Sequence, residues 1–200
     1  TDREGVRERI AEILELVRLI PPEAYMNRFP HALSGGELQR VSIARAMVLN
    51  PELLIADEPV SMLDVSVRAG ILNFFLELRK KLGITVLFIT HDLSVASYIA
   101  DRMGIMYLGK VVEEGAVESI VKNPQHPYTQ ALMKCVPHPD PTKRIREVSL
   151  KGEPPSPLNP PLGCHFHPRC PNAKEACSKK EPTCVQVEKD HQVACFLQDQ

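Results

Sequence analysis

Apolar residues in the first hundred positions follow helical and strand-like patterns that alternate along the chain. Residues 2–20 carry apolar side chains at every third or fourth position, and the two prolines that follow stop this pattern. The same spacing, with capping residues and terminators, predicts further helices. One of them ends before Pro51, because a residue that precedes proline disfavours helical geometry. These further helices are expected over residues 37–50, from a cap at Asp64 or Ser66 to about Lys81, and over residues 92–101.

Two short apolar runs lie between these helices and predict strands. Residues 53–56 form a continuous apolar run and residues 84–90 form a β-branched apolar run, and such runs are typical of strands buried on both faces of a parallel sheet. Strands that alternate with helices indicate an α/β fold with such a sheet. Ligands of open α/β sheets bind at the carboxyl ends of the strands, so the chemistry is expected just after each run. Residues 104–113 favour a hairpin with a turn at Leu108-Gly109.

Composition adds a second, different half to this picture. The chain is 44% hydrophobic and 24% charged, which is ordinary for a folded protein and argues against disorder. A net charge of −1 does not favour a general nucleic-acid or membrane-surface binder. However, 13 of the 18 prolines lie from Pro124 onward, and five of the six cysteines lie between Cys164 and Cys195. An α/β part is therefore followed by a small irregular extension rich in proline and cysteine.

Two adjacent carboxylates, Asp57 and Glu58, follow the first predicted strand. A strand-to-loop turn explains them simply, because Asp and the following Pro59 are ordinary turn residues. The other interpretation is a nucleotide site, because paired carboxylates at a dry sheet edge are costly unless a cation offsets them. Asp57 would then hold Mg²⁺, mostly through water, and Glu58 would polarise an attacking water molecule.

His91 and a serine-glycine turn are the other candidates for phosphate chemistry. His91 follows the second strand and is either a structural hydrogen-bonding residue or a group that reaches a terminal phosphate. Ser34, Gly35 and Gly36 open the helix over residues 37–50. Glycines let the backbone approach a ligand, and free N–H groups at a helix start attract anions. The simpler interpretation is a serine cap on a glycine-rich turn.

The order and spacing of these features are more specific than any one of them. Asp57 lies 23 positions after Ser34, and His91 lies 34 positions after Asp57. This combination resembles the nucleotide-binding subunit of ATP-binding cassette (ABC) transporters over roughly residues 5–135. The matching segments are Leu33–Gln39 (signature motif), Leu53–Pro59 (Walker B), Ser61–Asp64 (D-loop, with Met62 where alanine is usual) and His91 (switch histidine).

The resemblance implies a partial ABC-ATPase fold, related to the P-loop NTPases, and a composite site. Two ATP molecules are sandwiched in a head-to-tail dimer of such subunits. By that resemblance the signature of one subunit contacts ATP held by the other, whereas the strand-end residues act in cis. The implied set is Ser34, Gly35, Gly36, Glu37 and Gln39 for ATP in trans, Asp57 for Mg²⁺, Glu58 and His91 for catalysis, and Asp64 for communication across the dimer.

One motif of that family is not found in these 200 residues. The phosphate-cradling pattern G-x-x-x-x-G-K-[ST] does not occur, and neither a Q-loop nor an adenine-stacking aromatic residue is recognised. The simplest explanation is a chain that begins part-way through the domain, in its helical subdomain. We therefore expect that the 200-residue chain alone neither binds ATP tightly nor hydrolyses it.

The second half carries a further resemblance. Residues 125–132, which include His126-Pro127-Tyr128, resemble the extension of the oligopeptide/dipeptide branch of ABC importers. A short helix is predicted from about Tyr128 to Cys135, broken at Pro137. Residues 137–163 are proline-rich and indicate an extended linker or an irregular wrap over the core.

Five clustered cysteines follow this linker, separated by five, six, six and ten residues. In a cytosolic ATPase disulfides are disfavoured, and such clustering suggests a metal site. The spacing lacks the C-x-x-C pairs of common zinc sites, so zinc is not the default. Four thiolates could instead hold an iron–sulfur cluster. The simple alternative is a set of free, buried thiols that bind no metal. His165, His167 and His191 are possible ligands, but surface or hydrogen-bonding roles are the favoured expectation for them. By resemblance to the cysteine-rich tails of peptide-importer ATPases, the [4Fe–4S] ligands are Cys164, Cys170, Cys177 and Cys195, with Cys184 as a spare.

Taken together, the sequence predicts an ATPase subunit that hydrolyses ATP to drive import of di- or oligopeptides from the cytoplasmic face of the membrane. The implied partners are a second ABC ATPase subunit, membrane permeases and, indirectly, a substrate-binding protein, with no nucleic acid. Nickel or oligosaccharide cargo, a non-transport ABC ATPase, and a metal-binding interaction module are the alternatives. The expected segments are 1–50 (helical, signature), 51–123 (ATPase core), 124–163 (His-Pro-Tyr extension and linker) and 164–200 (cysteine-rich tail).

Overall fold

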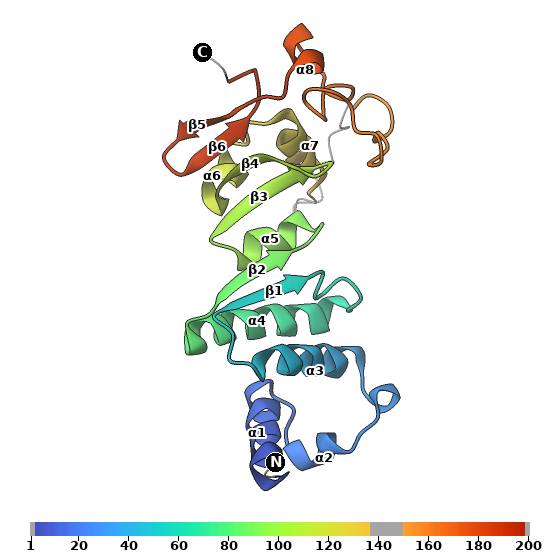
Figure 1. Cartoon of the computed structure of the whole chain (residues 1–200), viewed down its shortest axis with the longest axis vertical. Coiled ribbons are helices and arrows are strands. Elements are labelled where there is room, and N and C mark those ends of the chain that lie inside the picture. The colour runs from blue at the N-terminus through green and yellow to red at the C-terminus, as the bar shows by residue number, and fades with distance from the viewer. Residues whose placement is uncertain (1–2, 137–149, 199–200) are drawn as a thin grey trace, which may run out of the picture. The chain divides into compact units, whose positions relative to one another are not determined.

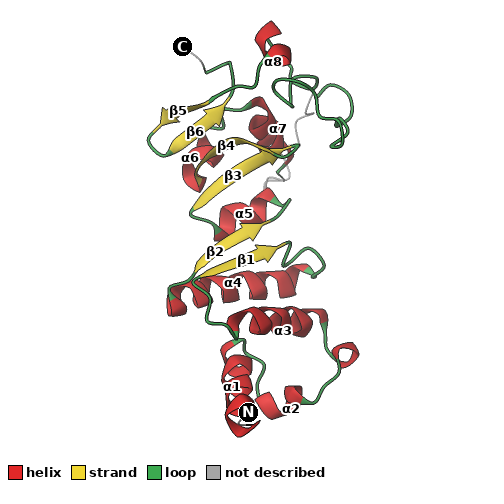
Figure 2. Ribbon diagram, viewed as in Figure 1, coloured by secondary structure: helices red, strands yellow, loops and turns green. Residues whose placement is uncertain are grey.

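The computed structural model describes residues 3–136 and 150–198. The chain divides into two compact units, Thr1–His91 and Asp92–Gln200, which are described separately. Figure 1 labels their helices and strands, and Figure 2 colours them by type. In the described residues, no helix has the length and apolar character needed to cross a lipid bilayer.

The N-terminal helices of the first unit differ from the sequence prediction at one end. Helix α1 spans Arg3–Leu16 and ends earlier than the predicted 2–20, because Arg18 adopts a left-handed backbone with φ of 61°. The proline pair that stops the pattern also starts another helix. Helix α2, Pro22–Met26, has proline in its first turn, where the missing N–H costs nothing. This helix and the 3₁₀ helix η1, Pro30–Ala32, are absent from the prediction.

The next two helices of this unit confirm the predicted elements. Helix α3 spans Gly35–Met47, with Ser34 as its cap. Helix α4 spans Val65–Leu82. Asp64, rather than Ser66, caps it by accepting a hydrogen bond from the backbone N–H of Val67. Gly83 ends it with φ of 66°, a left-handed conformation that glycine adopts without strain.

Strands β1, Leu53–Asp57, and β2, Thr85–Ile89, form the predicted parallel pair, joined through α4. Only one face of β1 is covered, so the expectation of burial on both faces is wrong for the described residues. Leu54 and Ala56 are buried on the face that also holds Phe88, whose ring packs edge-on against Phe75 of α4. Leu53 and Ile55 lie on the opposite face of β1 and are more than half exposed, because α4 covers only one face of the two-stranded sheet.

The second unit is built around an antiparallel sheet in the order β3-β4-β6-β5. The predicted hairpin is confirmed, and both residues of its Leu108-Gly109 turn have positive φ, as a two-residue hairpin loop requires. The elements of this unit are α5 (Leu93–Ile99), β3 (Arg102–Tyr107), β4 (Lys110–Ala116), α6 (Val117–Lys122), α7 (Pro127–Cys135), α8 (Glu175–Lys179), β5 (Cys184–Glu188) and β6 (His191–Ala194).

The cysteine-rich tail is more regular than the sequence suggests. Strands β5 and β6 form a hairpin, and β6 pairs with β4, so the tail extends the sheet instead of forming an irregular segment. Phe166, only 1% exposed, inserts its ring among Tyr107 and Tyr128 at centroid distances of 5.1 and 5.3 Å. The described part of the predicted linker, residues 150–163, contains no helix or strand, and residues 137–149 lie outside the described residues.

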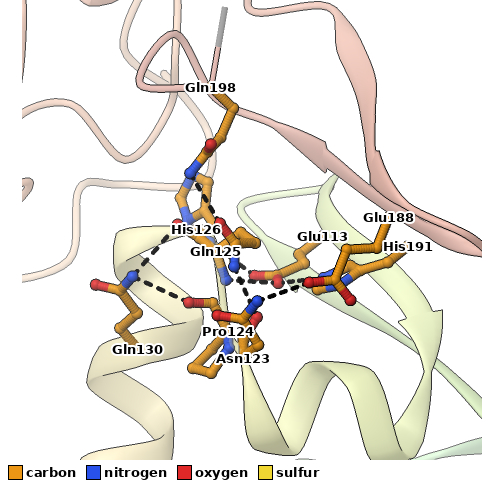
Figure 3. Close-up of polar contacts among 9 residues, drawn as sticks. All are labelled: Glu113, Asn123, Pro124, Gln125, His126, Gln130, Glu188, His191 and Gln198. Carbon is orange, nitrogen blue, oxygen red and sulfur yellow. Dashed lines mark hydrogen bonds and ion pairs between the residues drawn. The ribbon is translucent and has the colours of Figure 1, made fainter.

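A buried carboxylate joins three segments of this unit, as Figure 3 shows. The Glu113 side chain is fully buried. Its Oε1 accepts from the backbone N–H of Gln125 at 2.8 Å and lies 2.7 Å from Nε2 of His191, whereas Oε2 accepts from the backbone N–H of His126 at 2.8 Å. We call these four residues the Glu113 clasp. It fixes the His-Pro-Tyr turn and the C-terminal hairpin to strand β4.

His126 has a second role within this clasp. Burial lowers the pKa of its ring to about 4, although the nearby Glu113 carboxylate acts in the opposite direction. The ring is therefore neutral at neutral pH, which leaves Nδ1 free to accept a hydrogen bond. It accepts from the backbone N–H of Tyr128 at 3.0 Å and so caps α7.

Candidate functional site

Glu58 and His91 come together where strands β1 and β2 end. The Nδ1 atom of His91 lies 2.7 Å from Oε1 of Glu58, and the same oxygen accepts from the backbone N–H of His91 at 2.9 Å. The backbone N–H of Glu58 in turn donates to the carbonyl of Ile89. His91 is 78% exposed and Glu58 is 35% exposed, so both side chains are open to a ligand from solvent. A carboxylate held by a histidine at an accessible sheet edge suits proton transfer.

Asp57 and Asp64 lie on either side of Glu58 in the sequence and differ in their surroundings. Asp57 is the last residue of β1, is exposed, and pairs in register with Ile89 of β2. Asp64 caps α4, and hydrogen bonds from the Ser66 hydroxyl and then the Val67 N–H lower the pKa of its carboxyl. Asp64 therefore stays ionised, with one carboxylate oxygen already committed to its own helix.

The serine-glycine turn forms a complete capping box at the start of α3. The Ser34 hydroxyl donates to Oε2 of Glu37 at 2.7 Å, and the Ser34 N–H donates to the same oxygen at 2.8 Å. Hydrogen bonds from the backbone and hydroxyl of Ser34 lower the pKa of Glu37. Ser34 and Gly35 are exposed, so the turn is presented to solvent, with Gln39 half-buried on the same helix. A helix start of this kind attracts anions.

Glycine is required at the second position of this turn by close packing. A Cβ atom on Gly36 would lie 2.7 Å from a methyl group of Val67, and one on Gly35 would lie 3.3 Å from Leu63. The turn therefore packs against the D-loop segment and the first turn of α4. These contacts connect the signature segment with the loop that follows Glu58.

The four predicted cluster cysteines lie close together in the second unit. Burial raises the pKa of the Cys195 thiol to about 11, and three neighbouring thiols add to the shift: Cys164, Cys170 and Cys177. Cys184 is exposed on β5, and partial burial and the nearby Glu114 carboxylate raise the pKa of its thiol. Among the residues that the structure describes, no three His, Cys, Asp or Glu side chains form a group that could hold a metal ion.

The three tail histidines are hydrogen-bonding groups, as predicted. Nδ1 of His165 lies 2.9 Å from the carbonyl oxygen of Leu108, and Nδ1 of His167 lies 2.9 Å from that of Cys164. His191 belongs to the Glu113 clasp.

Two residues with a part in these arrangements escaped the sequence analysis. Tyr25, on the short helix α2, donates from its hydroxyl to Oε1 of Glu37 at 2.9 Å. No periodic pattern marks it, because α2 has only five residues. Glu113 is buried in β4, directly after the apolar pair Val111-Val112, and a charged residue that is buried in a strand indicates a buried partner.

Comparison with protein families finds two matching regions. The model of the ABC transporter family matches residues 3–61, and that of the oligopeptide/dipeptide transporter C-terminal region matches residues 112–177. Among solved structures, the chain is similar to the ADP conformation of MJ1267, an ATP-binding cassette of an ABC transporter, with 29% identity and a TM-score of 0.55. That similarity covers 65% of this chain and 51% of the other.

Curated relatives are similar over almost all of this chain. It is 47% identical to the dipeptide transport ATP-binding protein DppF of Haemophilus influenzae, over 95% of this chain and 58% of that protein. It is 51% identical to the oligopeptide transport ATP-binding protein AppF of Bacillus subtilis, with 95% and 58% coverage, and 46% identical to OppF of Escherichia coli, with 98% and 59% coverage. The chain thus spans less than three fifths of the length of these relatives.

Proposed function

Because this chain belongs to the ABC transporter ATP-binding proteins of the oligopeptide/dipeptide group, we propose that it is part of a subunit that hydrolyses ATP to drive peptide import. The observation that carries this proposal is the pairing of Glu58 with His91 at the strand ends, in a chain that also exposes the Ser34 turn. The names of the relatives favour peptides over nickel or oligosaccharides as cargo.

In the proposed reaction Glu58 is the general base. It takes a proton from the water molecule whose oxygen attacks the γ-phosphorus, and the bond to the β–γ bridging oxygen breaks as ADP leaves. His91 holds the Glu58 carboxylate through Nδ1 and can turn its exposed ring toward the phosphate. Asp57 would hold Mg²⁺ through water, and this ion would neutralise phosphate charge when bound.

The exposed Ser34 turn supplies the other half of the proposed site. The backbone N–H groups at the start of α3 and the Ser34 hydroxyl, which bonds to Glu37 in this structure, suit the γ-phosphate of ATP held by a second ABC ATPase subunit in a head-to-tail pair. One similar solved structure is a dimeric post-hydrolysis state of the ATP-binding cassette MJ0796 bound to ADP and Pi, 34% identical with a TM-score of 0.50 over 58% of this chain and 49% of the other. Gly35, Gly36, Glu37 and Gln39 belong to the same surface, and Asp64 communicates between the two subunits.

Permease subunits would anchor this pair at the cytoplasmic face of the membrane, and a substrate-binding protein would deliver the peptide. Residues 1–50 supply the signature segment and residues 51–123 the catalytic core. Residues 124–163 and 164–200 form the extension that distinguishes the oligopeptide/dipeptide group. The family match over residues 112–177 supports this assignment for residues 124–177 of the extension.

Replacing Glu58 by glutamine tests the proposed chemistry. In the longer protein with its permeases, Glu58→Gln should lower ATP hydrolysis by about 100-fold or more, because the general base is lost. ATP binding should persist, since glutamine keeps the size of the side chain. Phosphate release and nucleotide binding are the two measurements. Glu52→Gln, an exposed position just before the same strand, is the matched control and should keep full activity. Unchanged hydrolysis in Glu58→Gln would refute the proposed role.

The four neighbouring thiols support an iron–sulfur proposal. Four cysteine thiolates are the usual ligands of a [4Fe–4S] cluster, and four thiols of the tail lie near one another. The proposed ligands are Cys164, Cys170, Cys177 and Cys195. The cluster would be structural or regulatory, because the hydrolytic residues lie in the other unit.

Metal analysis tests this assignment. The protein purified without oxygen should contain about four irons and four sulfides per chain. Cys177→Ser should lose them, because it removes a buried ligand, whereas Cys184→Ser should retain them. Equimolar zinc, or iron that depends on Cys184, would contradict the assignment.

A further inference from the structure

The carboxylate of Glu37 has partners on both of its oxygens, and they come from different segments. Oε2 accepts from the N–H and the hydroxyl of Ser34 at 2.8 and 2.7 Å. Oε1 accepts from the hydroxyl of Tyr25 at 2.9 Å, across twelve residues of chain. Glu37 therefore links the serine-glycine turn with helix α2, which precedes the turn.

The Tyr25 ring is itself held in place. It is half-buried, and the guanidinium of Arg28 lies over its face at 4.8 Å from the ring centroid. A cation over an aromatic face is attracted to it and restricts the ring. The Tyr25 hydroxyl thus reaches Glu37 from an ordered side chain, so the hydrogen bond costs little further side-chain conformational entropy.

Ser34 has only one hydroxyl proton to donate, so Glu37 needs the hydrogen bond from Tyr25 when Ser34 turns to a phosphate. A serine hydroxyl has one proton, and in this structure that proton is donated to Glu37. An ionised phosphate can only accept, so Ser34 must release Glu37 before it can donate to a phosphate. At that moment Glu37 loses one of its donors and is left as a negative charge beside the incoming anion. The hydrogen bond from the Tyr25 hydroxyl still stabilises the charge on Glu37. It also keeps the Glu37 carboxylate oriented toward the Ser34 N–H.

We propose that Tyr25 is a positioning residue of the nucleotide clamp, which holds Glu37 while the Ser34 hydroxyl transfers from that carboxylate to phosphate. This inference rests on the proposed function, because it needs ATP at the serine-glycine turn. It assigns to α2 a part in nucleotide binding in trans. Tyr25 touches neither the phosphate nor the attacking water, so it alters how readily the clamp closes and leaves the chemical step at Glu58 unchanged.

Steady-state kinetics of the longer protein test the proposal. Tyr25→Phe should raise the KM for ATP by about five-fold, the loss expected for one hydrogen bond to a charged group that is partly exposed. The kcat should stay within about two-fold of wild type, because Glu58 and His91 lie elsewhere. Tyr98→Phe, an exposed tyrosine of the other unit, is the matched control and should change neither parameter.

A double-mutant cycle separates positioning from a merely structural role. In a Glu37→Ala background, Tyr25→Phe should have no further effect on KM, because its partner is gone. An equal effect in both backgrounds, a change in kcat alone, or an unchanged KM in the single variant would overturn the proposal.

Hydrogen exchange at the Ser34 amide supplies a readout that does not depend on activity. Exchange should be about three- to ten-fold faster in Tyr25→Phe, because the carboxylate that protects this amide is less firmly held. Unchanged exchange would overturn the proposal even if the protein proved not to be an ATPase. Wild-type protein without ATP hydrolysis, in contrast, would contradict the proposed function and leave the exchange result to decide the role of Tyr25.

Discussion

Glu113→Gln is expected to destabilise the second unit by about 3–5 kcal/mol, the usual cost of breaking a buried charged network by removing one partner. The Glu113 carboxylate accepts from two backbone N–H groups and faces the His191 ring, with no exposure to solvent. Glutamine keeps the shape but replaces one accepting oxygen by a donor, so at least one buried N–H faces another donor. Urea unfolding followed by near-ultraviolet circular dichroism measures the loss.

The neighbouring residue provides the control for this variant. Glu114 points to the other face of β4, is about half exposed, and approaches only Arg102, at 3.9 Å, among the ion pairs of the described residues. Glu114→Gln should change stability by less than about 0.5 kcal/mol, as is usual at the surface. Equal stability of both variants would show that the Glu113 clasp does not hold the unit together.

Phe166→Ala should cost about 3–5 kcal/mol, because it removes a fully buried ring from a well-packed core. Its ring packs against Tyr107 and Tyr128, so the same change should also alter tyrosine fluorescence. The chain has no tryptophan to obscure that signal. Leu162→Ala, at an 83% exposed position nearby in the sequence, should be almost neutral. A neutral Phe166→Ala would mean that the tail does not contribute to the core.

The elements that the sequence predicted well are those with long or repeated signals. Helix α4 has a cap at Asp64 and an end near Lys81 in the prediction, and the structure agrees, with Asp64 as the cap and Leu82 as the last residue. Helix α2 was missed because five residues are too few to show a period. Strands β5 and β6 have five and four residues and lack the continuous apolar run that marks β1 and β2, so the sequence does not predict them, although Cys184–Glu188 alternates in exposure as a strand should.

In the candidate site, residues marked by a local sequence pattern could be predicted, whereas contacts between residues far apart in the sequence could not. Glu58 and His91 could be predicted because each follows an apolar strand, and parallel strands bring their carboxyl ends to one edge. Their contact at 2.7 Å confirms that they converge. The Glu113–His191 pair joins residues 78 positions apart, and no local pattern encodes such a distance in sequence. Tyr25 escaped for a similar reason, because its role depends on the ring reaching Glu37 from another helix.

The central claim is that Glu58 of one subunit and the Ser34 turn of another form a single nucleotide site. It can be measured directly with a mixed dimer of the longer protein, isolated by two different tags, in which one copy carries Glu58→Gln and the other Ser34→Arg. Each variant alone should be inactive. The mixed dimer keeps one site with both partners intact and should hydrolyse ATP at about half the wild-type rate, as two-fold symmetry of a shared site requires. An inactive mixed dimer would contradict the claim, because it would place Glu58 and Ser34 in the same site of one chain.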